Sequence, residues 1–161
     1  MKIDDFYPQG FPPCYLPQTL TYYKVPIQRC SEFVYMKPND QYTDSHSPVI
    51  IAKDLFLFIW SDAPRFDDPP FVAGIPYAKT PEIWKQDRKL QDGYVKKCFS
   101  YGIDNPVPVS VVDRVVGNKL FLLDGITRIL YLLINNVEAF PVMCPNEYVA
   151  MLTNLASPTP R

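Results

Sequence analysis

The pattern of hydrophobic and polar positions is clearest in the last third of the chain. Two apolar runs, at residues 109–113 and 120–123, flank the turn sequence at residues 116–119, and this arrangement predicts a β-hairpin. Residues 126–133 then place apolar side chains on one helical face, and residues 139–143 indicate a last strand. A β-turn-β-α-β order is therefore the organising unit of the expected fold.

Shorter apolar runs occupy the middle of the chain. Residues 33–36 predict a strand. Residues 49–52 and 55–60 form a second apolar pair, which predicts either two strands or a strand and a short turn. Prolines and acidic residues make residues 61–76 a predicted loop, and His46 lies in a polar sequence that is also typical of a loop.

A helix is predicted to begin at Thr80-Pro81-Glu82, because this sequence supplies an N-cap, a proline for the first position and an acid for the first turn. Its apolar positions continue to Phe99, and Gly102 is a suitable residue to end it. Gly93 interrupts the pattern, so two shorter helices are the alternative. A C-terminal helix is predicted to begin at Pro145-Asn146-Glu147.

Proline is over-represented, with 18 residues against 6 glycines, and its average share is only about 5%. Since proline blocks long helices, residues 1–45 are expected to form a proline-rich, extended N-terminal segment. Residues 80–156 are expected to hold the helix and the β-β-α-β core. The length of 161 residues predicts one domain, of the mixed α/β (α+β) class.

The charge is nearly balanced, with 16 basic and 17 acidic side chains and a net charge of -1. Proteins that bind nucleic acid non-specifically usually carry a basic surplus, so nucleic acid is a weak candidate partner. One segment does crowd cations, at Lys85, Arg88, Lys89, Lys96 and Lys97. No leader pattern and no apolar run near the ~20 residues of a membrane span is found, so a cytoplasmic protein with no membrane association is expected.

The four cysteines lie far apart in sequence, and reduced thiols are expected for Cys14, Cys30, Cys98 and Cys144. The single histidine, His46, has no neighbouring ligand at zinc spacing, so no metal site is predicted. A catalytic triad built on His46 would need partners that the sequence does not reveal.

The junction at Asp124-Gly125 is the strongest candidate for a chemical site, because an apolar strand passes there directly into an amphipathic helix. The first turn of a helix leaves backbone N–H groups unpaired, and with the helix dipole these bind anions. Gly125 allows close approach to the backbone, and Arg128 can reach back with a planar fork of donors. The alternative stays open that Asp124 is a plain N-cap, Gly125 a packing residue and Arg128 a partner for a carboxylate.

The same segment, continued from Leu122 through the helix to Ala139-Phe140-Pro141-Val142, resembles the ParB/sulfiredoxin superfamily. With Trp84, Phe99, Gly102 and the entry Asn105-Pro106-Val107-Pro108, it further resembles the plasmid fertility-inhibition (oncogenic-suppression) branch. The resemblance implies a small mixed sheet with flanking helices and a phosphate site for ATP or CTP with Mg²⁺. The residues expected at that site are Asp124, Gly125, Thr127, Arg128 and Asn105.

The sequence also departs from the superfamily. Sulfiredoxins carry Gly-Cys-His-Arg at this junction, whereas Ile126 and Thr127 stand here at the Cys and His positions. Without a thiolate there is no nucleophile, so sulfiredoxin activity is excluded. Chromosome-partitioning ParB proteins carry Gly-Glu-Arg-Arg and a following helix-turn-helix domain, for which this chain has no room, and centromere binding is not expected.

Three functions follow from these observations. The resemblance implies a small inhibitor that binds a protein partner and blocks conjugative DNA transfer or type IV secretion, with a nucleotide-phosphate site. The first alternative is an immunity protein that covers a toxin with aromatic anchors. Tyr22, Tyr23, Tyr35 and Tyr42 are its candidate anchors. The second is a ParB-like nucleotide hydrolase or DNase, in which Asp124, Asp113 or Asp104 would place a metal ion or water.

Overall fold

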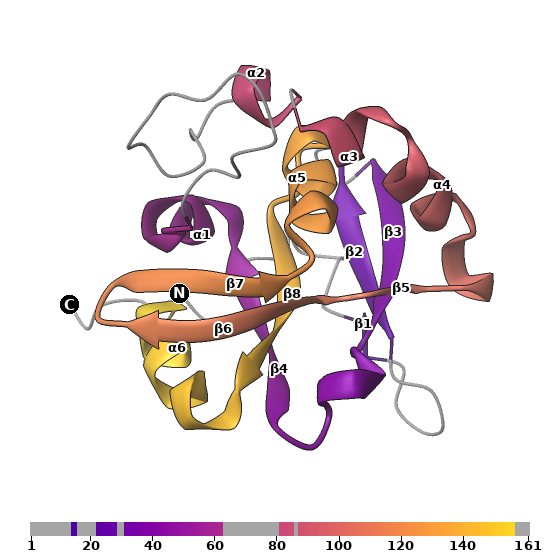
Figure 1. Ribbon diagram of the computed structural model, residues 1–161. Helices are drawn as coiled ribbons and strands as arrows, with labels where there is room; N and C mark the ends of the chain where they lie inside the picture. The colour runs from indigo at the N-terminus through magenta and orange to yellow at the C-terminus, as the bar shows by residue number, and fades with distance from the viewer. Residues whose placement is uncertain (1–13, 16–21, 29–30, 63–80, 86, 157–161) are drawn as a thin grey trace.

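In the computed structural model, the chain folds into two mixed four-stranded sheets with helices packed around them (Figure 1). The structure describes residues 14–15, 22–28, 31–62, 81–85 and 87–156. The architecture confirms the predicted α+β class, although two sheets are present where one was expected. Among the described residues, no helix has both the length and the apolar character needed to cross a membrane.

The larger sheet contains β4 (His46–Ala52), β6 (Ser110–Val116), β7 (Lys119–Asp124) and β8 (Ala139–Pro145), in the order β4-β8-β6-β7. Strands β6 and β7 form the predicted antiparallel hairpin. Helix α5 (Ile126–Ile134) then carries the chain across to β8, which pairs parallel to β6 and antiparallel to β4. All seven residues of β8 are buried, as expected for a central strand that is covered on both faces.

The smaller sheet contains β1 (Cys14–Tyr15), β2 (Tyr23–Ile27), β3 (Glu32–Lys37) and β5 (Val107–Pro108), in that order. Strand β3 contains the predicted strand 33–36, and its pairing with β5 is parallel. The described part of the proline-rich segment thus contains strands β1, β2 and β3. The end of β2 is joined to the end of α5, where Gln28 donates to the Asn135 carbonyl through its backbone N–H (2.7 Å) and to the Asn135 side chain through Nε2 (2.9 Å).

The apolar run 55–60 is a helix, α1 (Lys53–Ile59), and the prediction of a strand or short turn was wrong. Phe56, Ile59 and Trp60 are buried, whereas Phe58 is 75% exposed, which is a helical and not an alternating pattern. The Phe56 ring stacks on Trp60 (5.0 Å between centroids) and meets Phe140 edge-on (5.3 Å). This aromatic cluster turns the run toward the core, and only the tertiary packing decides between helix and strand.

The predicted helix from residue 81 to residue 99 is divided into α2 (Pro81–Trp84), α3 (Arg88–Gln91) and α4 (Tyr94–Ser100), followed by a 3-10 turn, η3 (Gly102–Asp104). Gly93 precedes α4 in the left-handed region with a φ of 81°, which confirms the interruption there. A further break separates α2 from α3. Thr80, the predicted N-cap, and most of the predicted loop 61–76 lie outside the described residues.

The remaining elements lie near β4 and at the C-terminal end. A 3-10 turn, η2 (Asp40–Tyr42), precedes β4, and another, η4 (Asn146–Tyr148), leads into α6 (Val149–Ala156), where the C-terminal helix was predicted. His46 was placed in a loop by prediction, but it begins β4 and pairs with Pro145. Of the tyrosines considered for an interface, Tyr23 is buried in the core and is therefore excluded as a surface anchor.

Candidate functional site: a cleft at the N-terminus of α5

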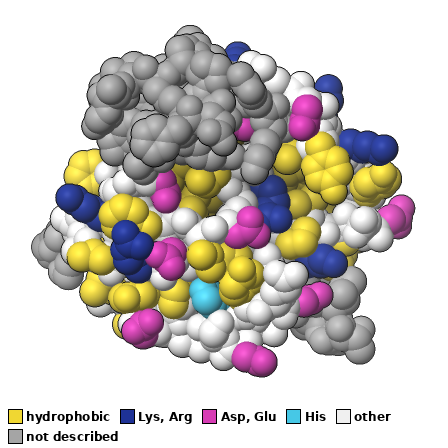
Figure 2. Space-filling model, viewed as in Figure 1, with side chains coloured by type: hydrophobic (Ala, Val, Ile, Leu, Met, Phe, Trp, Pro, Cys, Tyr) yellow, Lys and Arg dark blue, Asp and Glu magenta, His cyan; other side chains and the backbone are white. Residues whose placement is uncertain are grey.

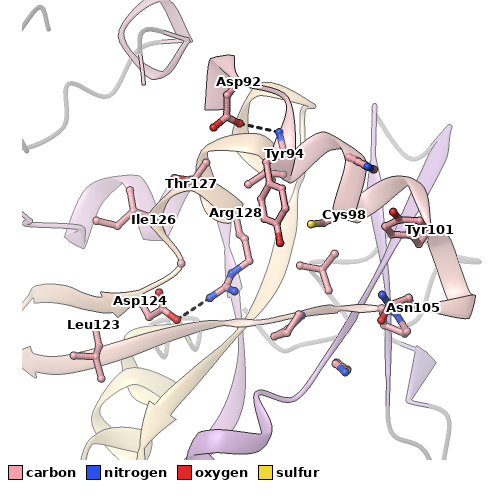
Figure 3. A pocket seen from close by; sticks show the side chains of 17 residues that line it. Asp92, Tyr94, Cys98, Tyr101, Asn105, Leu123, Asp124, Ile126, Thr127 and Arg128 are labelled. Atoms are coloured by element: carbon pink, nitrogen blue, oxygen red, sulfur yellow. Dashed lines mark hydrogen bonds and ion pairs between the residues drawn. The ribbon is translucent and has the colours of Figure 1, made fainter. Parts of the chain in front are cut away.

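A cleft of about 1000 Å³ opens at the N-terminus of α5. It lies between α4, the ends of β3 and β7, and the segment that contains β5 (Figure 3). The structure brings all the predicted site residues to this cleft, and the cleft lining contains Asn105, Asp124, Gly125, Thr127 and Arg128. Their grouping is a fact of the fold, while their role in binding phosphate stays a prediction.

Gly125 forms the turn between β7 and α5. Its φ of 89° lies in the left-handed region, which side chains rarely adopt. A Cβ at this position would lie 2.5 Å from Arg128 Nη2 and 2.8 Å from Ser110 Cβ, with the Ser110 hydroxyl closer still. Ser110 Oγ donates to the Gly125 carbonyl at 2.7 Å, so strand β6 holds the junction in place. Glycine is therefore required here both by the backbone angle and by the close approach.

A bulge in the β6–β7 hairpin directs the last residues of β7 toward the cleft. Val111 pairs with Asp124 and Val112 with Leu122, so Leu123 has no direct partner across the hairpin. Leu123 is consequently 51% exposed and lines the cleft, and Asp124 follows it at the mouth. Bulges are often found beside functional sites because they redirect a side chain.

Arg128 carries the main positive charge at the junction. Its Nη2 donates to Asp124 Oδ2 at 3.3 Å, a long ion pair between neighbouring turns of the chain (Figure 3). The Arg128 side chain is 19% exposed, and its Nε is buried without a hydrogen-bond partner in the described part of the chain. The predicted alternative of a carboxylate pair is thus realised, but it leaves a buried N–H of the guanidinium unsatisfied.

Thr127 and Asn105 occupy different surroundings within the cleft. Thr127 is buried in the first turn of α5, next to Arg128. Asn105 is exposed, and its backbone N–H closes the η3 turn on the Gly102 carbonyl at 3.3 Å. In Figure 3 Asn105 lies beside Tyr101, across the view from Asp124 and Leu123. Asn105 is therefore less suited than Thr127 to a phosphate held at the helix N-terminus.

Helix α4 supplies the wall that the sequence did not predict. Tyr94, Lys97, Cys98 and Tyr101 recur at helical spacing, and all of them line the cleft. Helix α4 is held against α5 by the Phe99 ring, which stacks on Tyr131 at 4.7 Å between centroids and an interplanar angle of 10°. At the start of α4, Asp92 Oδ1 accepts a hydrogen bond from the Tyr94 backbone N–H at 2.8 Å.

The charged side chains of the cleft suit a small anionic ligand better than a partner with a strongly negative surface. Lys37, Lys97 and Arg128 line it on the positive side, and Asp92 and Asp124 on the negative side. Figure 2 shows basic and acidic side chains interspersed on this face, without a continuous basic field. Of the cationic segment at residues 85–97, Lys97 lines the cleft, whereas Lys85 and Lys96 do not.

The acids considered for hydrolysis are not gathered in one place. Asp124 lines the cleft, but Asp104 and Asp113 do not, and Asp113 pairs instead with Arg114 Nη1 at 2.6 Å. Within the described ranges, no group of three His, Cys, Asp or Glu side chains is placed to hold a metal ion.

His46 lies away from the cleft, and its ring makes contacts that hold the fold together. Its Nδ1 is 2.7 Å from Ser45 Oγ, its Nε2 is 3.2 Å from the Val112 carbonyl, and its ring packs on Tyr42. Because a carbonyl oxygen can only accept, Nε2 donates in this contact, and in the neutral imidazole Nδ1 then accepts from Ser45. This contact links the first residue of β4 to β6, although β8 lies between the two strands in the sheet.

Sequence reasoning did not predict Lys37, Tyr94, Cys98 or Tyr101 as cleft residues. The spacing of Tyr94, Lys97, Cys98 and Tyr101 was visible in the sequence and indicates one helix face. Nothing in the sequence shows, however, that this face turns toward the Asp124-Gly125 junction. The contact depends on the packing of Phe99 against Tyr131, two residues that are 32 positions apart.

Comparison with known proteins gives the cleft a family context. A family model described as plasmid fertility inhibition factor matches residues 48–157. Among solved structures, the chain is similar to the crystal structure of the oncogenic suppression activity protein, a plasmid fertility inhibition factor, in its gold(I) cyanide derivative. The TM-score is 0.67 and the sequence identity 22%, over 91% of this chain and 76% of that chain. At this identity the structural likeness shows the fold alone.

A search of curated proteins finds no match. Neither of the other two comparisons tests the wider resemblance to the ParB/sulfiredoxin superfamily, which stays a prediction. The matched range 48–157 covers more than half of the chain and includes α4, the β6–β7 hairpin and α5. The chain therefore belongs to the plasmid fertility inhibition factor family.

Proposed function

We propose that this protein is a cytoplasmic inhibitor of conjugative DNA transfer. It acts by binding a protein component of the transfer or type IV secretion machinery. Its cleft binds the phosphates of a nucleotide. Family membership supports the inhibitory role. No observation in the structure favours the alternative of a toxin-immunity protein, and Tyr23, one of its candidate anchors, is buried.

One observation carries the nucleotide site. Arg128 Nε is buried without an acceptor in the described part of the chain, while its Nη2 makes only a 3.3 Å contact with Asp124. A buried, unpaired donor on a charged group is costly, and an anion at this point would remove that cost. A phosphate oxygen offers an acceptor of matching charge to the planar guanidinium fork.

The helix N-terminus supports the same ligand. The first intrahelical bond of α5 runs from Ile129 N to the Gly125 carbonyl at 3.2 Å, so the N–H groups before Ile129 have no acceptor within the helix. Gly125 has no side chain to cover them, and the dipole of the nine-residue helix favours a negative charge there. Thr127 adds a hydroxyl at the same end of the helix.

ATP or CTP with Mg²⁺ fits these residues. Magnesium is usually held by one or two carboxylates together with substrate phosphates, and it keeps several waters. The Asp124 side chain is 56% exposed at the cleft mouth and would hold the ion of a bound Mg²⁺–nucleotide. The ion would screen phosphate charge, while Arg128 and the first turn of α5 orient the phosphates.

Thermal unfolding in the presence of nucleotide tests the site. ATP or CTP with Mg²⁺ should stabilise the wild type by about 2.7 kcal/mol at a hundredfold excess over the dissociation constant. Arg128→Gln should remove this stabilisation. Arg114→Gln is the matched control, because Arg114 lies outside the cleft lining, where it covers the Phe121 ring at 4.2 Å. Equal nucleotide stabilisation of both variants would refute the site.

A mating assay tests the inhibitory role. Donor cells that carry a conjugative plasmid and express this chain should transfer the plasmid less often than donors with an empty vector. If the cleft takes part, Arg128→Gln should restore transfer and Arg114→Gln should not. Transfer that is unchanged by the wild type, across conjugative plasmids of several types, would contradict the proposal.

A further inference from the structure

The α4 wall of the cleft carries other kinds of side chains than the N-terminus of α5, where the phosphate site is proposed. Helix α4 presents Tyr94, Lys97, Cys98 and Tyr101 as one stripe along the cleft. Tyr94 is 69% and Tyr101 48% exposed, although large aromatic side chains are usually well buried. These rings and a cation thus line the same space of about 1000 Å³ as the proposed phosphate site.

Tyr101 differs from Tyr94 in what its ring can do. The side-chain interaction of the Tyr94 hydroxyl with the Cys98 thiol, one turn further along α4, is the main reason that the pKa of Tyr94 is raised above its ordinary value. Tyr94 is therefore held to its own helix. No ring contact or hydrogen bond of the Tyr101 side chain is found among the described residues, so its exposed face is available to a planar group.

Asn105 lies at the same end of the cleft as Tyr101. The two residues flank the η3 turn, whose backbone bonds run from Tyr101 N to the Cys98 carbonyl (3.4 Å) and from Asn105 N to the Gly102 carbonyl (3.3 Å). The Asn105 side chain is exposed, and in the part of the chain that is described it has no hydrogen-bond partner. A carboxamide offers both donors and an acceptor, which is the chemistry that reads the edge of a nucleobase.

We propose that Tyr101 and Asn105 form a nucleobase subsite: the base of a bound nucleoside triphosphate stacks on the Tyr101 ring, and its edge is hydrogen-bonded by the Asn105 carboxamide. The inference rests on the proposed phosphate site, and it adds a second point of recognition within the same cleft. It also gives Asn105 a different role from the phosphate contact expected from sequence. Lys97, between the two tyrosines on the stripe, would face the sugar-phosphate part of the ligand.

The stacking on Tyr101 sets the expected contribution of the base to nucleotide affinity. A base stacked on an aromatic side chain contributes about 1–3 kcal/mol, as measured by substitution with alanine. Since each 1.4 kcal/mol corresponds to about a tenfold change in affinity, loss of the ring should weaken nucleotide binding by roughly 5- to 140-fold. Inorganic triphosphate has no base and should be unaffected.

Calorimetric titration of the full chain with ATP, CTP and inorganic triphosphate, each with Mg²⁺, separates the two subsites. We expect the wild type to bind both nucleotides more tightly than inorganic triphosphate. Tyr101→Ala should bring nucleotide affinity down to that of inorganic triphosphate, whereas Tyr101→Phe, which keeps the ring, should retain wild-type affinity. Asn105→Ala should change the ratio of ATP to CTP affinity.

Ile103→Ala is the control, because Ile103 is similarly exposed (49%) in the η3 turn but does not line the cleft. It should bind all three ligands as the wild type does. The base subsite is overturned if Tyr101→Ala binds nucleotides within twofold of the wild type, or if it weakens inorganic triphosphate equally. Failure of the wild type to bind any of the three would instead overturn the phosphate site, and the base subsite with it.

Discussion

Replacement of Gly125 by alanine tests whether the junction between β7 and α5 is built as the structure shows. The left-handed backbone at Gly125, with a φ of 89°, costs a non-glycine residue about 1–2 kcal/mol. The new Cβ would also fall 2.8 Å from Ser110 Cβ and nearer still to its hydroxyl. If Ser110 turns away, its 2.7 Å bond to the Gly125 carbonyl is lost, at about 1 kcal/mol.

The expected destabilisation of Gly125→Ala is therefore about 2–3 kcal/mol, before the close contact with Arg128 is considered. Gly117→Ala is the matched control. Gly117 has a similar φ of 60°, but a Cβ there would meet no atom within 4 Å. This variant should lose only the backbone strain, about 1–2 kcal/mol. The entropy of the unfolded chain changes equally in both variants and cancels from the comparison.

Urea unfolding, followed by circular dichroism, measures both free energies. The added substitution Ser110→Ala removes the nearest atom, so the double variant with Gly125→Ala should be more stable than the sum of the two single effects predicts. The same substitution combined with Gly117→Ala should be additive. Equal losses for Gly125→Ala and Gly117→Ala, with no coupling to Ser110, would refute the close-packed junction.

Three further predictions concern the core and its titrating groups. Burial raises the pKa of Asp62 above its ordinary value, despite hydrogen bonds from Leu122 N (2.8 Å) and Trp60 Nε1 (2.6 Å). Ionisation of Asp62 thus disfavours the folded state. The free energy of unfolding of the wild type, relative to that of Asp62→Asn, should therefore fall as the pH rises through the raised pKa. An increase in this relative free energy over the same pH range would contradict the prediction. Burial raises the pKa of the Cys144 thiol to about 12, so peptide mapping after alkylation at pH 8 should find Cys144 unmodified in the native protein and modified in urea. Phe56→Ala should lower the free energy of unfolding in urea by about 3–5 kcal/mol, since Phe56 is fully buried between Trp60 and Phe140. A loss below about 1 kcal/mol would show that the cluster is not packed as described.

The C-terminal half of the fold could be predicted from sequence because its signals are local. The β6–β7 hairpin has a turn sequence between two apolar runs, and α5 has an uninterrupted apolar face. Helix α1 could not be predicted, since its run of apolar residues fits either a buried strand or a helix. The choice is made by the aromatic cluster around Phe56, which joins α1 and its C-cap residue Trp60 to Phe140 of β8.

Apart from Asn105, which the family resemblance implied, the candidate site could be predicted only on one side. Asp124, Gly125, Thr127 and Arg128 lie in one short segment, so the helix N-terminus brings them together without any long-range contact. The opposite wall, with Tyr94 and Tyr101, depends on how α4 docks. That placement is decided by contacts such as the stacking of Phe99 on Tyr131, which no periodicity in the sequence reveals.

The central claim is that Arg128 binds phosphate in the cleft through the N–H that the protein leaves unpaired. The most direct test is the ¹H–¹⁵N resonance of Arg128 Nε in the full chain, assigned by its absence in Arg128→Lys. Addition of ATP with Mg²⁺ should shift this resonance saturably, while the Nε resonance of Arg114, outside the cleft lining, should stay in place. An Arg128 Nε resonance that does not move at nucleotide concentrations in the millimolar range would contradict the account.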